Sequence, residues 1–500
     1  MHTTQATTEC YQQNFDFQGL GGRRVVADFS GGFLSSDGGA LLLREMERSQ
    51  RLCEQLAGCF SDYRDPDFVE HDLAVMLRQR ILGLALGYED INDHERLRLD
   101  PLLAAVCGRA DVLGQERHMT QDKGRALAGK STLNRLELGA QEINARTKKI
   151  QAHPERIEAL LLLRGVAAIP RRSEVIVLDF DATDDPLHGR QEGRFYHGYY
   201  GGYCYLPLYC FCGDIPLWAQ LRTAERDASA GTLEALQKIV AAIRARFGRH
   251  TVIIVRGDSG FCRDEIMSWI EAQSNVHYVL GLARNSRLEQ MLAPAFWETA
   301  ALLDEDAVLC ARAAGAHAPP VLPEGSARVF TELRYRTRES WTKERRVIGK
   351  AEMTAGKANP RFIVTDITGA QSWAKARAEF QDGRGLYEQF YCARGDMENR
   401  IKEQQLDMFA GRTSTAFMTS NQLRLWFSTF AYLLLGQMRA VALAGTRMAR
   451  ATVGTIRLHL LKIAAQLTVS VRRIHVRLCS ACPAQDVFAQ AHTRLRALSS

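Results

Sequence analysis

Three aspartates stand at the ends of two strongly apolar stretches of the chain. Asp179 and Asp181 lie in the β-branched run at residues 175–183, and Asp258 follows a second apolar run at residues 251–255. Because side chains alternate along a strand, Asp179 and Asp181 should share one face at the strand's carboxyl end. Acids in such a place need a cation, hydrogen bonds or water, since burying an unpaired charge is costly. They are therefore candidate metal ligands.

A third acid, Glu398, lies in a segment with helical spacing. Tyr391, Arg394, Glu398 and Lys402 recur at intervals of three and four residues, so they share one face of a helix. Together with two strand-end aspartates, Glu398 could bind two Mg²⁺ ions about 3.5–4 Å apart. One ion would activate water or a 3′-hydroxyl and the other would stabilise the leaving oxygen, which is in-line phosphodiester exchange. Arg394 and Lys402 would contact phosphate oxygens.

Each of these acids also has a purely structural explanation. Asp181 could belong to a loop of solvated acids with Asp184 and Asp185, and Asp258 could be a turn residue that binds its own backbone. Glu398 could be part of an exposed ladder of ion pairs, worth about a few tenths of a kcal/mol per pair. Placement in a common fold is what favours the catalytic interpretation.

The elements around the acids follow a definite order. The pattern predicts a meander of antiparallel strands, then a helix, a strand, a helix and a strand, which is the order of a ribonuclease-H-like α/β fold. These strands are expected at 175–181, 195–205, 206–212, 215–222, 251–255 and 277–283, with helices at 229–247 and 263–273. That fold also requires a final helix. The next strongly helical segment starts only near residue 385.

The change of pattern along the chain predicts five regions. Residues 1–35 form an N-terminal extension, and residues 36–165 form a helical domain, a candidate for DNA binding, with no strand pattern. Residues 171–284 plus 385–420 form the ribonuclease-H-like catalytic domain with a mixed sheet. Residues 285–384 form a mainly β insertion, with strands at 327–337, 345–354 and 361–367, and residues 421–500 form a basic helical C-terminal region.

Charge is concentrated at the end of the chain. Residues 421–500 contain 11 Lys or Arg and one acid, Asp486, so this segment carries about +10, whereas the other 420 residues together carry about −3. A segment of this kind suits a phosphate backbone, because each neutralised phosphate releases condensed counterions. A solubilising helical face is the alternative.

Composition excludes several classes of protein. The hydrophobic share of 46% is ordinary and no apolar run approaches the roughly 18–20 residues of a membrane helix, so no membrane span is expected. The N-terminus lacks the pattern of a secretory signal, so a cytoplasmic location is expected. The 12 cysteines form no spaced framework, and Cys479 and Cys482 make a CxxC without a second pair of zinc ligands.

Two motifs together resemble those of bacterial insertion-sequence transposases of the DDE type. Asp181-Ala182-Thr183 resembles the Asp-x-Thr motif of the first acid in that group, which is why Asp181 is assigned as the first acid and Asp179 as the alternative. Tyr391, Arg394 and Glu398 match the spacing of the signature Tyr-x2-Arg-x3-Glu-x6-Lys. The resemblance covers about residues 20–480.

The lysine of that signature is absent at its expected position. Gln405 occupies it, so the lysine's role either is lost or has passed to Lys402, one turn earlier.

The resemblance implies catalysis by Asp181, Asp258 and Glu398 with two Mg²⁺ ions, which Mn²⁺ can replace. It implies cut-and-paste transposition, with binding to double-stranded DNA at terminal inverted repeats and at a target, by a homodimer on paired ends. It also implies a nucleoid-associated protein when DNA is bound. Such enzymes flip a base onto an aromatic of the insertion. Trp341 is one candidate for that aromatic, and Trp297 and Trp373 lie in the same region.

Two other functions remain open. Residues 179–183 also fit the Asp-x-Asp-x-Thr motif of haloacid-dehalogenase-like phosphatases, with Asp179 as nucleophile and Asp181 as acid/base. Asp258 followed by Asp264 imitates the later metal motif of that family, although the predicted meander does not suit its fold. The non-enzymatic alternative is a transposase-derived DNA-binding protein that is no longer catalytic.

Overall fold

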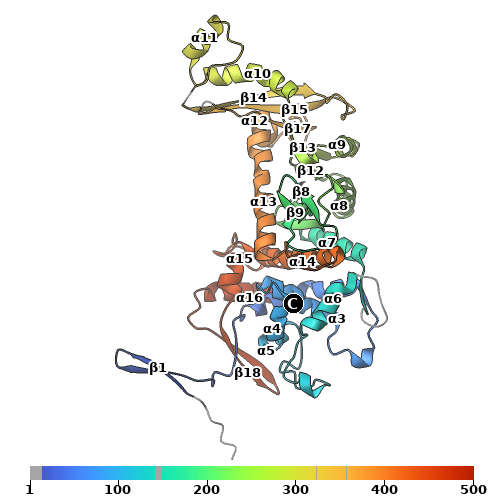
Figure 1. The fold of residues 1–500 in the computed structure, drawn as a ribbon, viewed down its shortest axis with the longest axis vertical. Helices are drawn as coiled ribbons and strands as arrows, with labels where there is room; N and C mark the ends of the chain where they lie inside the picture. The colour runs from blue at the N-terminus through green and yellow to red at the C-terminus, as the bar shows by residue number, and fades with distance from the viewer. Residues whose placement is uncertain (1–13, 141–148, 323, 356, 500) are drawn as a thin grey trace, which may run out of the picture. The chain divides into compact units, whose positions relative to one another are not determined.

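The computed structural model describes residues 14–140, 149–322, 324–355 and 357–499. The chain divides into two compact units, of which the first comprises Met1–Gly58, Asp62–Leu136 and Gln437–Ser500. The second comprises Cys59–Ser61 and Glu137–Gly436 and contains all the predicted acids (Figure 1).

A large mixed sheet forms the centre of the second unit. Its strands follow in the order β11-β10-β6-β12-β13-β17-β15-β14, with the short β16 (Lys357–Ala358) paired to β15. The strands β6, β12 and β13 are parallel, and every other pair along this path is antiparallel. Their bounds are Ile215–Gln220 (β11), Leu208–Cys212 (β10), Val175–Ala182 (β6), Val252–Gly257 (β12), Val276–Leu282 (β13), Arg361–Thr365 (β17), Arg345–Thr354 (β15) and Ser326–Tyr335 (β14).

Alternation along β6 decides which face of the sheet carries the acids. Ile176, Leu178 and Phe180 enter a core that includes α8 (Thr232–Phe247) and α9 (Asp264–Glu271). The residues between them therefore point to the opposite face. There Val175 and Val177 pack in a second core that includes the helical segment near residue 390. Asp179 and Asp181 thus leave the strand toward that helical segment, as the period of two requires.

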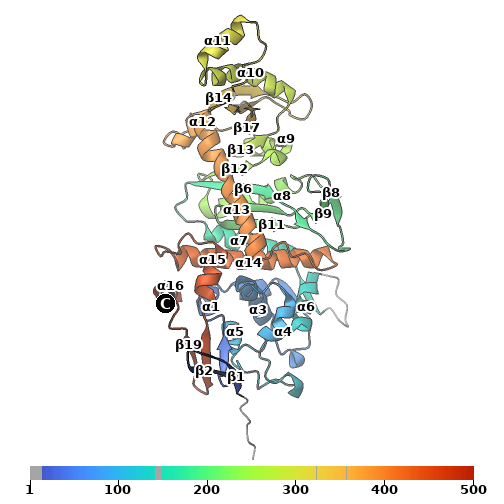
Figure 2. The ribbon, with the colours of Figure 1, turned by 60° about the vertical axis from the view of Figure 1, so that its left-hand side comes forward.

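The helical segment that carries Glu398 changes its winding several times. A π-helical turn at Leu386–Tyr391 is followed by a 3-10 turn at Cys392–Arg394, then by α13 (Gly395–Lys402) and a second π-helical turn at Glu403–Asp407. Figure 2 shows this segment in orange as one long rod crossing the strands of the sheet. α13 contacts β6 directly.

The region between β13 and this helix both agrees with and departs from the predicted pattern. The three expected strands are confirmed as β14, β15 and β17, and they extend the same sheet. Two helices, α10 (Ser286–Ala301) and α11 (Glu305–Ala313), precede them. The sequence pattern did not indicate these helices; α10 contains Pro294, a residue that normally argues against a helix interior.

The first unit is mainly helical but contains strands that the pattern did not predict. Its helices include α1 (Ala40–Gln50), α3 (Leu73–Ala85), α5 (Pro101–Val106) and α16 (Gln485–Ser499). Residues 15–27 form a hairpin of β1 (Phe15–Leu20) and β2 (Arg23–Ala27).

The prediction of a wholly helical C-terminal region is wrong for residues 465–478. These residues form a hairpin of β18 (Ala465–Ser470) and β19 (Arg473–Leu478), which pairs with β3 (Phe33–Ser35). Apolar residues alternate along both strands, which is the period of a β-strand. The prediction of helices relied on the basic composition of the segment and did not use this period.

Short strands also interrupt the stretch 36–165, where none was expected. β4 (Phe60–Asp62) and β5 (Ile150–Ala152) pair as a two-stranded sheet. Three residues are too few to show a period of two. Among the described residues, no helix is long and apolar enough to cross a membrane.

Candidate active site

Asp181 and Asp258 lie at equivalent positions at the ends of two neighbouring parallel strands. Residues 179 and 256 are paired across the parallel strands β6 and β12, so residues two further along, Asp181 and Asp258, leave the sheet at the same edge. Asp258 also begins a 3-10 turn, and its Oδ1 accepts a hydrogen bond of 2.8 Å from the amide of Gly260. Asp258 is therefore a turn residue that binds its own backbone, as the structural explanation predicted. The turn uses only Oδ1, so Oδ2 can bind another group.

Arg394 bridges the two aspartates. Its Nη2 atom lies 3.0 Å from Oδ1 of Asp181 and 3.9 Å from Oδ2 of Asp258. Burial opposes the charged form of Arg394, but the charges of the two carboxylates prevail and raise its pKa above the ordinary value. The structure therefore brings Asp181, Asp258 and Arg394 together, as their predicted roles require.

The charge of this cluster is not fully balanced. Burial raises the pKa of Asp181 to about 6, and Arg394 opposes the shift, whereas the nearby charges of Asp258 and Glu398 add to it. One guanidinium thus offsets only one of the two negative charges that it bridges. Hard oxygen donors with excess negative charge suit a divalent cation such as Mg²⁺. The residues present fit such an ion.

Glu398 is directed to a different partner. Its Oε1 accepts from Nζ of Lys402 at 2.7 Å, and both side chains are more than half exposed. The bond from Lys402 lowers the pKa of Glu398, and the pair is the exposed i,i+4 ladder considered as an alternative. Within the described parts of the chain, no three His, Cys, Asp or Glu residues are close enough together to hold a metal ion. Glu398 would have to leave Lys402 to join the two aspartates.

Tyr391 reaches the strand next to Asp258. Its ring lies 5.6 Å from that of Tyr387, and its hydroxyl oxygen lies close to Gly281 of β13. A Cβ at Gly281 would stand 2.6 Å from that oxygen and 3.1 Å from the carbonyl carbon of Asp258, so only glycine permits this approach. Gly281 was not singled out from the sequence, although an isolated glycine inside an apolar strand is a known sign of close backbone approach.

Asp179 forms an ion pair with a buried arginine, Arg256, that was not predicted from the sequence. Nε and Nη2 of Arg256 donate to the two carboxylate oxygens of Asp179 at 2.5 and 2.8 Å, and both side chains are buried. Nη1 of Arg256 donates to the carbonyl oxygen of Phe390. Burial raises the pKa of Asp179, and Arg256 opposes that shift. A single arginine within an apolar strand was the available signal, since such a charge needs an acidic partner.

This ion pair joins the three segments that carry the candidate catalytic acids. Asp179 precedes Asp181 by two residues, Arg256 precedes Asp258 by two, and Phe390 belongs to the helical segment of Glu398. The winding changes from π-helical to 3-10 just after Phe390, at Tyr391–Cys392. Such bulges frequently mark functional sites.

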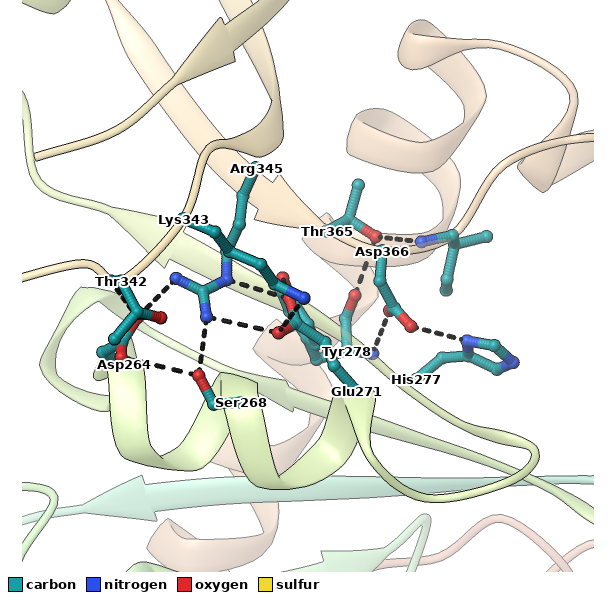
Figure 3. Close-up of polar contacts among 11 residues, drawn as sticks. Asp264, Ser268, Glu271, His277, Tyr278, Thr342, Lys343, Arg345, Thr365 and Asp366 are labelled. Carbon is teal, nitrogen blue, oxygen red and sulfur yellow. Dashed lines mark hydrogen bonds and ion pairs between the residues drawn. The ribbon is translucent and has the colours of Figure 1, made fainter.

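The phosphatase alternative loses two of its residues. Both oxygens of its nucleophile, Asp179, are bound by Arg256. Asp264 belongs to a separate cluster, in which its Oδ1 lies 2.6 Å from Nη1 of Arg345 and accepts from the amide of Thr342 (Figure 3). The same arginine binds Glu271 at 2.9 Å. Neither acid is free for the chemistry that this alternative needs.

Trp341 lies in the core and not on a DNA-facing surface. It is 3% exposed, its ring stands edge-on to Tyr335, and the guanidinium of Arg345 lies 5.3 Å above it. A base could not stack on it without displacing these neighbours. Trp341 is therefore a core residue, and the prediction that it could be the base-stacking aromatic is wrong.

Gln405 has a structural role of its own. Its Nε2 donates to Oδ1 of Asp185 at 3.0 Å and to the carbonyl oxygen of Asp184 at 3.2 Å. Asp185 is fully buried, and burial raises its pKa to about 7, although the bond from Gln405 opposes the shift. Gln405 thus ties the helix to the segment that follows β6, while Lys402 binds Glu398.

Asp185 is expected to make stability depend on pH. Its folded pKa of about 7 exceeds the ordinary 3.8, so between about pH 4 and pH 7 the unfolded chain releases a proton that the folded protein keeps. Stability should fall as pH rises through this window. Asp185→Asn, which can still accept from Gln405, should flatten the curve. Urea unfolding at several pH values measures this, with the exposed Asp306→Asn as control. Parallel curves for Asp185→Asn and the parent would contradict it.

A piggyBac transposase synaptic complex with hairpin DNA, solved by cryo-EM, is similar over 84% of this chain and 78% of that chain, with 10% identity and a TM-score of 0.38. A similarity this weak does not establish a common fold. Among curated protein sequences, none matches. The family model "Transposase DDE domain group 1" matches residues 17–500, and the chain therefore belongs to this family of DDE transposases.

Proposed function

We propose that this protein cuts and joins DNA by in-line phosphodiester exchange, with Asp181, Asp258 and Glu398 as its catalytic acids. The observation that carries the proposal is the pair of level aspartates at the ends of β6 and β12, bridged by Arg394. Family membership supports the reaction class, and the placement of these residues supports their assignment as the site.

A ribonuclease-H-like fold for the catalytic domain is part of the proposal. The order β11-β10-β6-β12-β13, with the first two strands antiparallel to the parallel trio, supports it. The helix α13 against β6 supplies the last element. We assign residues 171–284 plus 385–420 to this domain, residues 285–384 to an insertion within it, and residues 36–165 and 421–500 to DNA binding.

Each residue of the candidate site would have its own role in the reaction. Asp181, Asp258 and Glu398 would hold two Mg²⁺ ions, or Mn²⁺ in their place, which activate the attacking oxygen and stabilise the leaving one. Arg394 would bind a phosphate oxygen, for which its planar fork is well suited, when Asp181 serves as a metal ligand. Lys402, released by Glu398, can do the same as a point charge. Tyr391 would hold the DNA from the same helical face.

The substrate and the biological setting complete the proposal. The match of Tyr391, Arg394 and Glu398 to the Tyr-Arg-Glu-Lys signature supports a bacterial insertion-sequence transposase that acts as a homodimer on terminal inverted repeats and a target DNA. Gln405 at the lysine position is a departure that its bond to Asp185 explains structurally. Lys402 is therefore the residue we assign to the lysine's role.

The test is a cleavage and strand-transfer assay on DNA that carries the ends of the element, in Mg²⁺. Asp258→Asn should lose activity, because an amide cannot supply the carboxylate oxygen that faces Arg394. Glu265→Gln is the matched control, since it neutralises an exposed acid seven residues away. Equal activity of Asp258→Asn and the parent would remove the assignment of the site. A parent that binds the ends but never cuts them would instead indicate a non-catalytic DNA-binding protein.

A further inference from the structure

A small sheet next to the candidate active site exposes a cluster of aromatic side chains. The sheet has the order β7-β9-β8, with bounds Asp185–Pro186, Gly202–Tyr205 and Phe195–His197. Residues 194–205, which we call the aromatic hairpin, carry five rings that are between 37% and 86% exposed. They are Phe195, Tyr196, Tyr199, Tyr200 and Tyr203. Contiguous exposed apolar surface of this kind usually marks a binding site.

The rings are ordered against one another. Tyr196 and Tyr203, a cross-strand pair, stand edge to face with centroids 5.6 Å apart, and Tyr199 and Tyr200 do so at 5.0 Å. The guanidinium of Arg194 lies 4.8 Å above the ring of Tyr203. These contacts fix the rings relative to each other and still leave much of their area open to a ligand.

The aromatic hairpin lies close to the strand-end acids. β7 begins at Asp185, four residues after Asp181, and pairs with β9 through Asp185 and Tyr205. Ala182, next to Asp181, packs against the small core that contains Cys204 of β9. Burial, together with the charges of Asp184 and Asp181, raises the pKa of Tyr200 to about 12. Figure 2 shows β8 and β9 at the same level of the second unit as β6.

The charge around the rings suits a nucleic acid strand. Arg190 and Arg194 are exposed, and Glu192, which lies between them in the sequence, accepts a hydrogen bond from the amide of Met418. Bases stack on aromatic rings, and arginine binds the phosphates between them, which is how proteins hold single strands. In a paired duplex the faces of the bases are covered by their neighbours. The ligand that matches both features is therefore unpaired DNA.

We propose that the aromatic hairpin binds unpaired bases of the DNA strand next to the phosphate that is cut. The proposal rests on the proposed function, because it takes Asp181 as a residue of the cutting site. It adds a binding site outside the carboxylates and makes opening of the DNA end part of substrate recognition.

Binding is measured on the Asp258→Asn protein, so that no DNA is cut. The probe is a duplex with a four-nucleotide unpaired end that contains 2-aminopurine, whose fluorescence falls when it stacks. The Tyr196→Ala/Tyr203→Ala variant should lose most of the quenching and bind this DNA about tenfold or more weakly, since each stacked base contributes on the order of 1–3 kcal/mol. Its affinity for the same duplex with fully paired ends should not change.

Two controls separate stacking from folding and from general DNA binding. Tyr196→Phe/Tyr203→Phe keeps the rings and should behave like the parent. Phe17→Ala/Phe29→Ala removes two exposed rings of the N-terminal extension, 61% and 93% exposed, and should also leave quenching unchanged.

Three results would overturn the proposal. One is unchanged quenching in the alanine variant, and another is an equal loss of affinity for paired and unpaired ends. The third is a change of oligomeric state in the absence of DNA, which would make the aromatic hairpin a contact between copies of the chain. Because the assay uses a protein that cannot cut, its outcome is independent of whether the parent cleaves DNA.

Discussion

Asp181→Asn is expected to lower DNA cleavage and strand transfer by about 10³-fold or more, while leaving the folded protein as stable as the parent or more stable. A carboxylate that holds a catalytic cation contributes several kcal/mol to the transition state, and each 1.4 kcal/mol is about a factor of ten in rate. The same carboxylate is unfavourable for folding, since burial raises its pKa to about 6. Removing its charge at pH 7.5 relieves that cost.

The opposite signs of the two effects make this prediction specific to the site. A residue that merely supports the fold would lose stability and activity together. The measurements are the rate of strand cleavage on terminal-repeat DNA and the midpoint of thermal unfolding at pH 7.5 without metal. Asp184→Asn, three residues further along, is the matched control and should cleave like the parent. Full activity of Asp181→Asn would exclude it as the first acid.

Arg256→Met is expected to destabilise the second unit by about 3–5 kcal/mol, the usual consequence of leaving a buried charge without its partner. Asp179 would remain buried with both oxygens deprived of their donors. The double variant Asp179→Leu/Arg256→Met should recover most of that stability, because replacing both charges by apolar groups removes the cost of burying them. Urea unfolding measures both changes.

Activity should not return with stability in the double variant. The carbonyl oxygen of Phe390 loses its donor when Arg256 is replaced, so the helical segment of Glu398 is no longer tied to the two strands. The exposed pair Arg384 and Glu388 is the matched control, and Arg384→Met should change neither stability nor cleavage. Recovery of full cleavage by the double variant would show that the ion pair has only a stabilising role.

Those parts of the fold that rest on local pattern could be predicted from the sequence. β6 and β12 are continuous β-branched runs, and α8 repeats its apolar residues at helical spacing, so burial and period agree. The level placement of Asp181 and Asp258 also followed, because the predicted order of elements makes their strands parallel neighbours. Local pattern and topology were sufficient for these two residues.

Contacts between distant segments could not be predicted in the same way. The partner of Arg256 lies 77 residues away, and no local period indicates which acid it meets. Glu398 and Lys402 share one helix face, as the spacing predicted, but the pairing of Glu398 with Lys402 instead of the aspartates depends on side-chain rotamers. The hairpin at residues 465–478 is a separate case, because its alternating apolar residues are a local signal that the prediction from basic composition did not use.

The strands β14, β15 and β17 continue the sheet that carries the candidate acids, and this has a mechanical consequence. β17 pairs directly with β13, so β14, β15 and β17 are held by an unbroken ladder of backbone hydrogen bonds and not by a hinge. Four strand steps separate β12 from β14, which at about 4.8 Å each is roughly 19 Å. That length corresponds to about five or six base pairs at 3.4 Å each. A DNA contact made by β14 would therefore lie at a constant distance from the strand-end acids. This distance would set the position at which the duplex is cut.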